Sequence, residues 1–257
     1  MNNTIEKYAE SEKHHWWHRA RRHIIFTLLD KYSSQNHGIE PSPRPSPLRR
    51  GRKVLDVGCG PGTTMSHLER FGQVMGIDIS PDAVKFCRDS GHKYTVCASA
   101  EKLPIKDEEF SMITMLDVLE HIEDDMQVLH ELARICKPNG IILLTVPAYR
   151  FLWGDIDEIC RHKRRYTASE LCAKLMAVGL HIEKVSYMNA LLLPVTWLSR
   201  RWKAMTGKNK PLKSPFEKNY PSWLSHILES LFKLEVSFLK IWDLPFGVSI
   251  ICVARKQ

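Results

Sequence analysis

Short apolar runs alternate along this chain with longer segments in which apolar residues recur every three or four positions. The runs predict strands that are buried on both faces, near residues 53–57, 73–78, 93–97, 110–116 and 141–146. The intervening spacing predicts helices near residues 63–71, 81–90 and 124–136. Strands that alternate with helices in this way predict an α/β fold with a parallel sheet.

The same pattern continues after the fifth strand. Thr167 and Glu170 have the spacing of a capping box, which predicts a helix that ends at Gly179. Residues 181–187 then predict a sixth strand and residues 248–255 a seventh. The segment Pro138-Asn139-Gly140 predicts a helix stop and a turn.

Three segments lie outside this core. Helical spacing predicts one or two helices in residues 1–32, which cover the sheet or a ligand. Alternating prolines predict a linker at residues 33–52. Residues 190–246 form a helical insertion between the core at 53–189 and its final strand at 247–257. Its apolar helices, flanked by tryptophans and arginines, favour a dimer face or an interfacial patch for a lipid-like acceptor, with ordinary packing over the sheet as the alternative.

The turn after the first strand indicates a ligand site. The strand ends at Asp56 and Val57, and Gly58, Gly60 and Gly62 follow at alternate positions. Glycines there allow a positive φ and let a ligand approach the main chain. A dinucleotide fingerprint would place glycine at Thr63, so an NAD oxidoreductase is disfavoured. Asp78, about 20 residues further on at the next strand end, is placed to bind ribose hydroxyls.

Asp-x-Gly-x-Gly-x-Gly followed by Gly-Ile-Asp-Ile-Ser resembles the class I S-adenosylmethionine-dependent methyltransferases of the bacterial small-molecule and lipid–glycan type. Further similar segments lie at residues 100–104, 116–121 and 132–140, so the resemblance covers about residues 52–147. It implies a Rossmann-like seven-stranded sheet, mostly parallel with helices on both faces and the last strand antiparallel. It also implies S-adenosylmethionine as cofactor and S-adenosylhomocysteine as product.

The resemblance implies a set of cofactor-binding residues. Asp56, Gly58 and Gly60 would hold the methionine end, Asp78 and Ile79 the ribose and adenine, and Ala100 and Glu101 would lie beside the adenine. The full set that we expect at the cofactor is Asp56, Gly58, Cys59, Gly60, Asp78, Ile79, Ala100, Glu101, Leu116 and Asp117. The family usually has an acid at the position of Ser99, so a hydroxyl or the backbone must replace that contact with the adenine amino group.

Methyl transfer depends mainly on placing donor and acceptor in line, and a base is needed only if the acceptor must lose a proton. Candidates follow the fourth and fifth strands, where ionisable residues gather. We expect catalytic roles for His121, His162 and Tyr166, and substrate contacts for Trp17, Glu120, Trp153, Arg164 and Arg165. For Glu120 and Asp117 the alternative is a helix-start role, and for the arginines a solvated basic run. No metal site is expected; the histidines at residues 14–18 face different directions on a helix.

Composition limits the partners and the compartment. The formal net charge of +8 and the pI of about 9.1 suit an anionic small-molecule or lipid-linked acceptor, while no nucleic-acid module is recognisable. The seven cysteines form no Cys-x-x-Cys pair, and Cys59, Cys87, Cys97, Cys136 and Cys252 fall in predicted core elements, which indicates reduced thiols. With no membrane span or signal peptide, we expect a cytoplasmic protein, with peripheral contact at the inner membrane face and a homodimer as open alternatives.

The predicted function is methyl transfer from S-adenosylmethionine, to oxygen on a small or lipid-linked acceptor. Two alternatives stay open. One is methylation of RNA or protein, and the other is a regulatory protein that binds S-adenosylmethionine without turnover.

Overall fold

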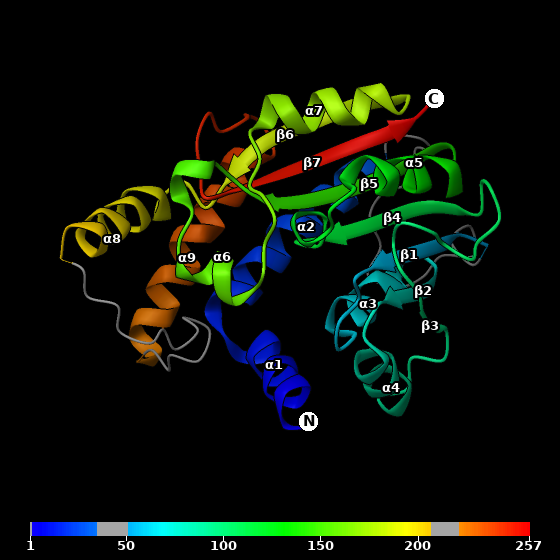
Figure 1. Ribbon diagram of the computed structural model, residues 1–257, viewed down its shortest axis with the longest axis horizontal. Coiled ribbons are helices and arrows are strands. Elements are labelled where there is room, and N and C mark those ends of the chain that lie inside the picture. Colours follow the sequence, from blue (N-terminus) through cyan, green and yellow to red (C-terminus); the bar gives the residue numbers. More distant parts are fainter. Residues whose placement is uncertain (1, 35–50, 207–220) are drawn as a thin grey trace.

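A computed structural model describes residues 2–34, 51–206 and 221–257. It has one seven-stranded sheet in the order β3-β2-β1-β4-β5-β7-β6 (Figure 1). The strands are β1 (Lys53–Val57), β2 (Gln73–Asp78), β3 (Thr95–Cys97), β4 (Phe110–Leu116), β5 (Cys136–Pro147), β6 (Leu180–Met188) and β7 (Ser249–Lys256). All neighbours from β3 to β5 pair in parallel, and β7 is antiparallel to both β5 and β6. The predicted fold class is confirmed, including its antiparallel last strand.

Helices and short 3₁₀ turns connect these strands. The helices are α1 (Asn2–His14), α2 (Trp16–Ser34), α3 (Thr63–Leu68), α4 (Pro81–Asp89), α5 (Asp125–Ile135), α6 (Asp155–Ile159), α7 (Ala168–Ala177), α8 (Leu192–Thr206) and α9 (Ser222–Leu239). The 3₁₀ turns are η2 (Glu69–Phe71), η3 (Leu119–His121) and η4 (Arg150–Leu152). Among the described residues, no helix is long and apolar enough to span a membrane.

The sheet is covered on both faces. Leu132 of α5 and Leu171 of α7 are fully buried in the cluster on one face. Ile24 of α2, Leu68 of α3 and Val236 of α9 belong to the cluster on the other. Both faces therefore exclude water, which explains why the central strands read as nearly continuous apolar runs.

Strand boundaries agree with the sequence except at β3 and β5. The strand predicted from Lys93 begins at Thr95, and the strand predicted from Ile141 begins at Cys136. The turn predicted at residues 138–140 is therefore wrong as a boundary. The register of β4 against β5 shifts there, and Asn139 has a φ of 62°. The helix before these residues does end, at Ile135, but the turn-forming residues lie in a bulge inside β5 and not ahead of it.

The segments outside the core agree in part. The N-terminal region forms two helices, and α2 continues to Ser34, past the predicted boundary at residue 32. The helices α8 and α9 lie between β6 and β7, as predicted for the insertion. The proline-rich linker falls on residues 35–50, which are outside the described residues, as are residues 207–220 of the insertion.

All seven cysteines are unpaired. Cys59, Cys87, Cys136 and Cys252 are buried, as expected, whereas the prediction of a buried Cys97 is wrong. Cys97 is exposed because its strand, β3, forms the edge of the sheet.

Candidate active site

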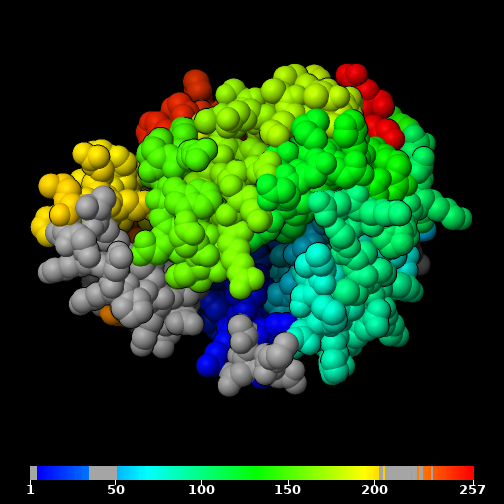
Figure 2. All heavy atoms as spheres, in the orientation of Figure 1, coloured from blue at the N-terminus to red at the C-terminus, as the bar shows by residue number. Residues whose placement is uncertain are grey.

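A cavity of about 1760 Å³ lies at the carboxyl edge of the sheet. Its lining comes from the N-terminal residues 7–21, the glycine turn after β1, the ends of β2 and β4, and residues 156–163. In Figure 2 the blue atoms of the N-terminal helices lie in a hollow between the yellow-green segment after β5 and the cyan atoms that follow β1. Segments far apart in the sequence thus form one cavity.

The glycine turn forms the floor of this cavity. Gly58 and Gly60 have φ values of 75° and 53°, which residues with a Cβ rarely adopt. The amide groups of Gly58 and Cys59 both donate to the carbonyl of Ile77, at 2.7 and 3.0 Å, and this fixes the turn against β2. A Cβ on Gly58 would lie 2.2 Å from Val118, so glycine is required there. The turn leaves its backbone open to a ligand.

Asp78 lies at the end of β2 and holds the same turn. Its carboxylate accepts hydrogen bonds from the amides of Gly60, at 2.9 Å, and Ser80, at 2.8 Å. A carboxylate has about four acceptor positions, so it keeps capacity for two hydroxyl groups. Beside it Ile79 lines the cavity and is 73% exposed. A fixed acceptor next to an exposed apolar side chain suits a ribose and an adenine ring.

Asp56 is buried beneath the turn and accepts a hydrogen bond of 2.7 Å from the hydroxyl of Thr114. Burial raises the pKa of Asp56 to about 7, although the Thr114 hydroxyl acts in the opposite direction. A positively charged ligand near this carboxyl would favour its ionised form. The residues at the floor therefore fit a cationic cofactor such as a sulfonium.

The carboxylate of Glu101 lies close to Ser99, the position at which the family usually has an acid. The hydroxyl of Ser99 donates to Oε2 of Glu101 at 3.1 Å, and both residues line the cavity. The expectation of a hydroxyl or the backbone for the adenine amino group stays a prediction. The carboxylate of Glu101, two residues after Ser99, is a further acceptor at this edge of the cavity.

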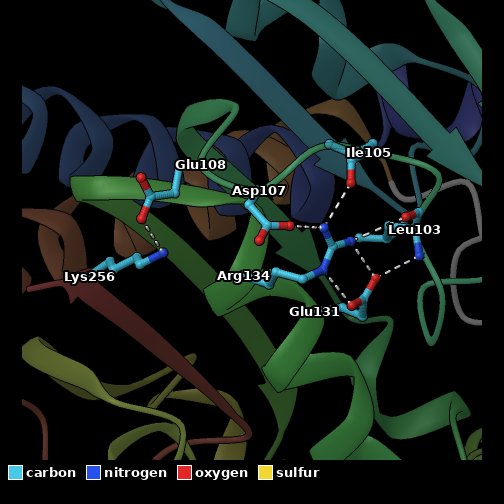
Figure 3. Close-up of polar contacts among 7 residues, drawn as sticks. All are labelled: Leu103, Ile105, Asp107, Glu108, Glu131, Arg134 and Lys256. Atoms are coloured by element: carbon cyan, nitrogen blue, oxygen red, sulfur yellow. Dashed lines mark hydrogen bonds and ion pairs between the residues drawn. The ribbon is translucent and has the colours of Figure 1, made fainter.

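Arg134 of α5 holds the segment that follows Glu101 (Figure 3). Its guanidinium donates to the carbonyls of Leu103, at 3.2 Å, and Ile105, at 2.8 Å. It also pairs with Asp107 at 2.6 Å and with Glu131 at 2.7 Å. Charge-assisted bonds of this kind are among the stronger ones in proteins. These contacts attach the segment after Glu101 firmly to α5.

The opposite side of the cavity is built from the segments after β4 and β5. His121 in η3 and His162 after α6 meet edge to face, with ring centroids 4.7 Å apart. The amide of Lys163 donates to the carbonyl of Glu120 at 2.7 Å, which joins the two segments. Nδ1 of His162 lies 2.9 Å from a carboxylate oxygen of Asp157, a residue with no exposed surface.

The two histidines have opposite electrostatic environments. Burial lowers the pKa of His121, and the nearby His162 lowers it further. Burial would also lower the pKa of His162, but the hydrogen bond to Asp157 and the charge of Glu120 outweigh it and raise this pKa to about 9. At neutral pH His121 is neutral and His162 is protonated. Such a divergence within one site is typical of groups with separate chemical roles.

Glu120 is the least satisfied polar group in this part of the site. Its side chain is fully buried, and neither carboxylate oxygen has a hydrogen-bond partner among the described residues. Burial and the nearby Asp117 raise its pKa well above the ordinary value. A buried carboxyl group without hydrogen-bond partners costs free energy, and such costs are common at ligand sites.

The N-terminal helices close the cavity through Arg21. Its guanidinium pairs with Asp117 at 2.7 Å and donates to the hydroxyl of Thr145 at 2.6 Å. The same hydroxyl donates to Asp117 at 2.9 Å. Trp17, predicted to contact substrate, lines the cavity with Arg21 over its ring. The sequence analysis missed Arg21, whose only signal was a charge within the apolar half of α2.

Four predicted site residues do not line the cavity. Tyr166 is buried and donates to Asp125 at 2.9 Å, and Arg165 is buried against Asp157 at 2.7 Å. Arg164 pairs with Asp125 at 3.1 Å, and the indole of Trp153 donates to Glu158 at 2.6 Å. The segment that includes α6 turns inward. The four side chains therefore attach this segment to itself and to α5. We leave them out of the candidate site.

The strand order, the glycine turn and the acid at the end of β2 define a Rossmann-like fold of the class I methyltransferase type. Residues 55–144 match the family model described as "Methyltransferase domain". This part of the chain is a class I S-adenosylmethionine-dependent methyltransferase domain.

Curated relatives include the ubiquinone biosynthesis O-methyltransferases of Xanthomonas oryzae pv. oryzae and Methylococcus capsulatus. The Xanthomonas protein is 31% identical over 158 residues, 54% of this chain and 66% of that protein. The Methylococcus protein is 31% identical over 154 residues, 55% of this chain and 60% of that protein. The match spans less than two thirds of either relative.

Solved structures share the fold at low identity. Phosphoethanolamine N-methyltransferase 2 of Haemonchus contortus, in complex with S-adenosyl-L-methionine, has a TM-score of 0.60 at 16% identity, over 100% of this chain and 57% of that chain. An S-adenosylmethionine-dependent methyltransferase of Mesorhizobium loti has a TM-score of 0.53 at 15% identity, over 82% of this chain and 94% of that chain.

Proposed function

We propose that this protein transfers a methyl group from S-adenosylmethionine to an oxygen atom of a small or lipid-linked acceptor. One observation carries the proposal. The glycine turn with Asp78, which suits a nucleoside, and the pair His121 and His162, which suits an ionisable acceptor, line the same cavity. A donor and an acceptor held there would lie close enough for direct displacement.

The donor side would bind and orient the cofactor. Asp56 and the turn from Gly58 to Gly60 would hold the methionine end, with Leu116 and Asp117 at the end of β4 beside it. Asp78 and Ile79 would hold the ribose and adenine, and Ala100 and Glu101 the adenine edge. When bound, S-adenosylmethionine supplies an electrophilic methyl group, and most of the rate enhancement comes from alignment.

The acceptor side would handle the proton and the charge. His121 is neutral at pH 7 and can accept the proton of an acceptor hydroxyl. His162, protonated and held by Asp157, places positive charge beside the oxygen as it becomes anionic. The name of the curated relatives denotes methyl transfer to oxygen, which supports this class of acceptor.

Apolar surface next to the cavity supports a lipid-linked acceptor. Trp17, Ile156 and Ile159 line the cavity, and Ile159 is more than half exposed. On α8 the exposed apolar side chains are Val195, Trp197, Leu198, Trp202 and Met205. We therefore extend the proposal to peripheral membrane contact through α8; a homodimer would instead cover the same side chains.

Calorimetric titration with S-adenosylmethionine, S-adenosylhomocysteine and NAD tests the cofactor assignment. We expect binding of the first two alone, and binding of NAD or of none of the three would contradict it. Transfer of labelled methyl groups to phenolic, phosphorylated and lipid-linked hydroxyl compounds then tests the acceptor. Labelling of RNA or protein, or cofactor binding without turnover on any acceptor, would favour the two alternative functions.

A further inference from the structure

Three potential metal ligands meet at the acceptor side of the cavity. Glu120, His121 and His162 each offer one ligand atom, and these atoms all lie within 4.8 Å of one another. No other group of this kind occurs in residues 2–34, 51–206 and 221–257, so the histidines of the N-terminal helices form none. We propose that Glu120, His121 and His162 bind a divalent transition-metal ion, of which Zn²⁺ is the representative.

The state of Glu120 is the main argument for a ligand at this position. Its carboxylate is fully buried, and both oxygens lack a hydrogen-bond partner among the described residues. Native proteins leave few buried polar groups in this condition, and those that remain are often partnered by a bound ion. A cation would compensate the carboxylate directly.

The surroundings hold the other groups in place. Asp157, with no exposed surface, contacts Nδ1 of His162 at 2.9 Å, and a histidine that binds a metal commonly donates its other ring nitrogen to a carboxylate in this manner. The hydrogen bond from the amide of Lys163 to the carbonyl of Glu120 fixes the spacing between the two segments. Residues around the cluster therefore hold its side chains in position.

The donor set indicates the kind of ion and its use. Two imidazoles and one carboxylate suit Zn²⁺ or Co²⁺ and leave a fourth position open, whereas Mg²⁺ prefers oxygen ligands. All three residues line the cavity, so the open position is accessible to a ligand there.

The chemical role of the ion rests on the proposed function, whereas its binding does not. The ion would hold the acceptor oxygen and lower the pKa of its hydroxyl, so that the proton leaves to solvent. The oxygen electron pair then forms the bond to the methyl carbon, and the carbon–sulfur pair stays on sulfur. In this form of the enzyme His121 acts as a metal ligand and not as the base, and His162 releases a proton to solvent when it binds the ion and no longer acts as a cation.

The test is calorimetric titration of the chelator-treated full chain, without an affinity tag, with Zn²⁺, Co²⁺ and Mg²⁺. We expect one Zn²⁺ or Co²⁺ per chain at this site, no binding of Mg²⁺ at the same concentrations, and Co²⁺ absorption bands typical of a low coordination number. His121→Gln should weaken binding about tenfold or more, on the scale found when metal-site residues are altered. His130→Gln, an exposed histidine on α5, is the matched control and should bind as the natural chain does.

Glu120→Gln, which tests the buried ligand, should weaken binding similarly, with thermal unfolding measured to confirm that it folds. His121 has exposed surface, unlike the fully buried Glu120, so the His121→Gln result stands even where Glu120→Gln fails to fold. Equal Zn²⁺ affinity in His121→Gln and His130→Gln would overturn the proposal, as would preferential binding of Mg²⁺. S-adenosylmethionine affinity is measured on the same samples, so that loss of the metal proposal and loss of the proposed function are separate results.

Discussion

The donor and acceptor sides of the cavity differ in how their polar groups are satisfied. On the donor side, Asp78 accepts two amide hydrogens and the Arg134 network holds the adjacent segment (Figure 3). On the acceptor side, Glu120 is buried without a partner for either oxygen among the described residues. Asp78 and Arg134 thus have protein partners, whereas a ligand would supply the partner that Glu120 lacks.

Backbone conformation shows the same contrast. The donor turn takes positive φ values at glycines, where they cost little. At the end of β4, where the donor and acceptor sides meet, Asp117 has a φ of 54° despite its Cβ, and its carboxylate is held by Arg21 and Thr145. Strain of this kind is retained where surrounding contacts impose it, and it is frequent at functional sites. Changes on the two sides should therefore affect different steps.

The largest effect should come from His121. His121→Gln should lower kcat by about 10²- to 10⁴-fold, because it removes a group that handles the acceptor proton or its metal. The affinity for S-adenosylmethionine should stay within about twofold, since the donor side is intact. Steady-state kinetics and calorimetry measure the two quantities, with His130→Gln as control. A parallel loss of cofactor affinity would contradict the division into two sides.

Asp78 should give the converse result. Asp78→Ala should weaken S-adenosylmethionine binding by about 1–3 kcal/mol, because a charged acceptor for the ribose is lost and Gly60 loses its anchor. Calorimetric titration gives the value, and Asp82→Ala, an exposed acid on α4, is the control. Unchanged affinity would contradict the assignment of Asp78 to the ribose.

The pair formed by His162 and Asp157 should appear in the pH dependence of stability. The pKa of His162 is raised to about 9 in the folded chain, above its ordinary value of 6.5, so protonation stabilises the fold. This contribution is complete below about pH 6.5 and is lost as the pH rises through 9. Thermal unfolding of the natural chain and of His162→Gln, with a metal chelator, should differ by about 1–2 kcal/mol at low pH and converge above pH 9. A constant difference across this range would show that the pair does not stabilise the fold.

The smallest effect concerns Glu101. Glu101→Gln should weaken S-adenosylmethionine binding by about 0.5–1.5 kcal/mol, the scale of one hydrogen bond. Ser99→Ala, which keeps the carboxylate, should weaken it less. If Ser99→Ala has the larger effect in the same calorimetric assay, the hydroxyl and not the carboxylate contacts the adenine.

The donor side was predictable because its signals are local. Gly58, Gly60 and Asp78 stand in consecutive strand ends, and the carboxyl ends of parallel strands meet at one edge. The bounds of β1, β2 and β4 followed from apolar runs that are buried on both faces. Bulges such as that near Asn139 depend on the neighbouring strand, and so the turn residues alone misplaced the start of β5.

The acceptor side was predictable only in part, because its contacts join distant segments. His121 and His162 were candidates by residue type, but their meeting depends on how the segment after α6 folds back. The same fold covers the side chains of Arg165 and Tyr166, which the sequence analysis placed at the site as accessible groups. Arg21 comes from a helix more than 90 residues before its partner Asp117, a distance at which residue spacing carries no signal.

Arg21 also joins the N-terminal helices to the end of β4. The helix that carries it is anchored in the core by Ile24, Ile25 and Leu28, while the residues before it form one wall of the cavity. The ion pair with Asp117 joins that wall to the edge where β4 ends. The wall is therefore held at two places, by the buried apolar side chains of α2 and by an ion pair that reaches the end of β4.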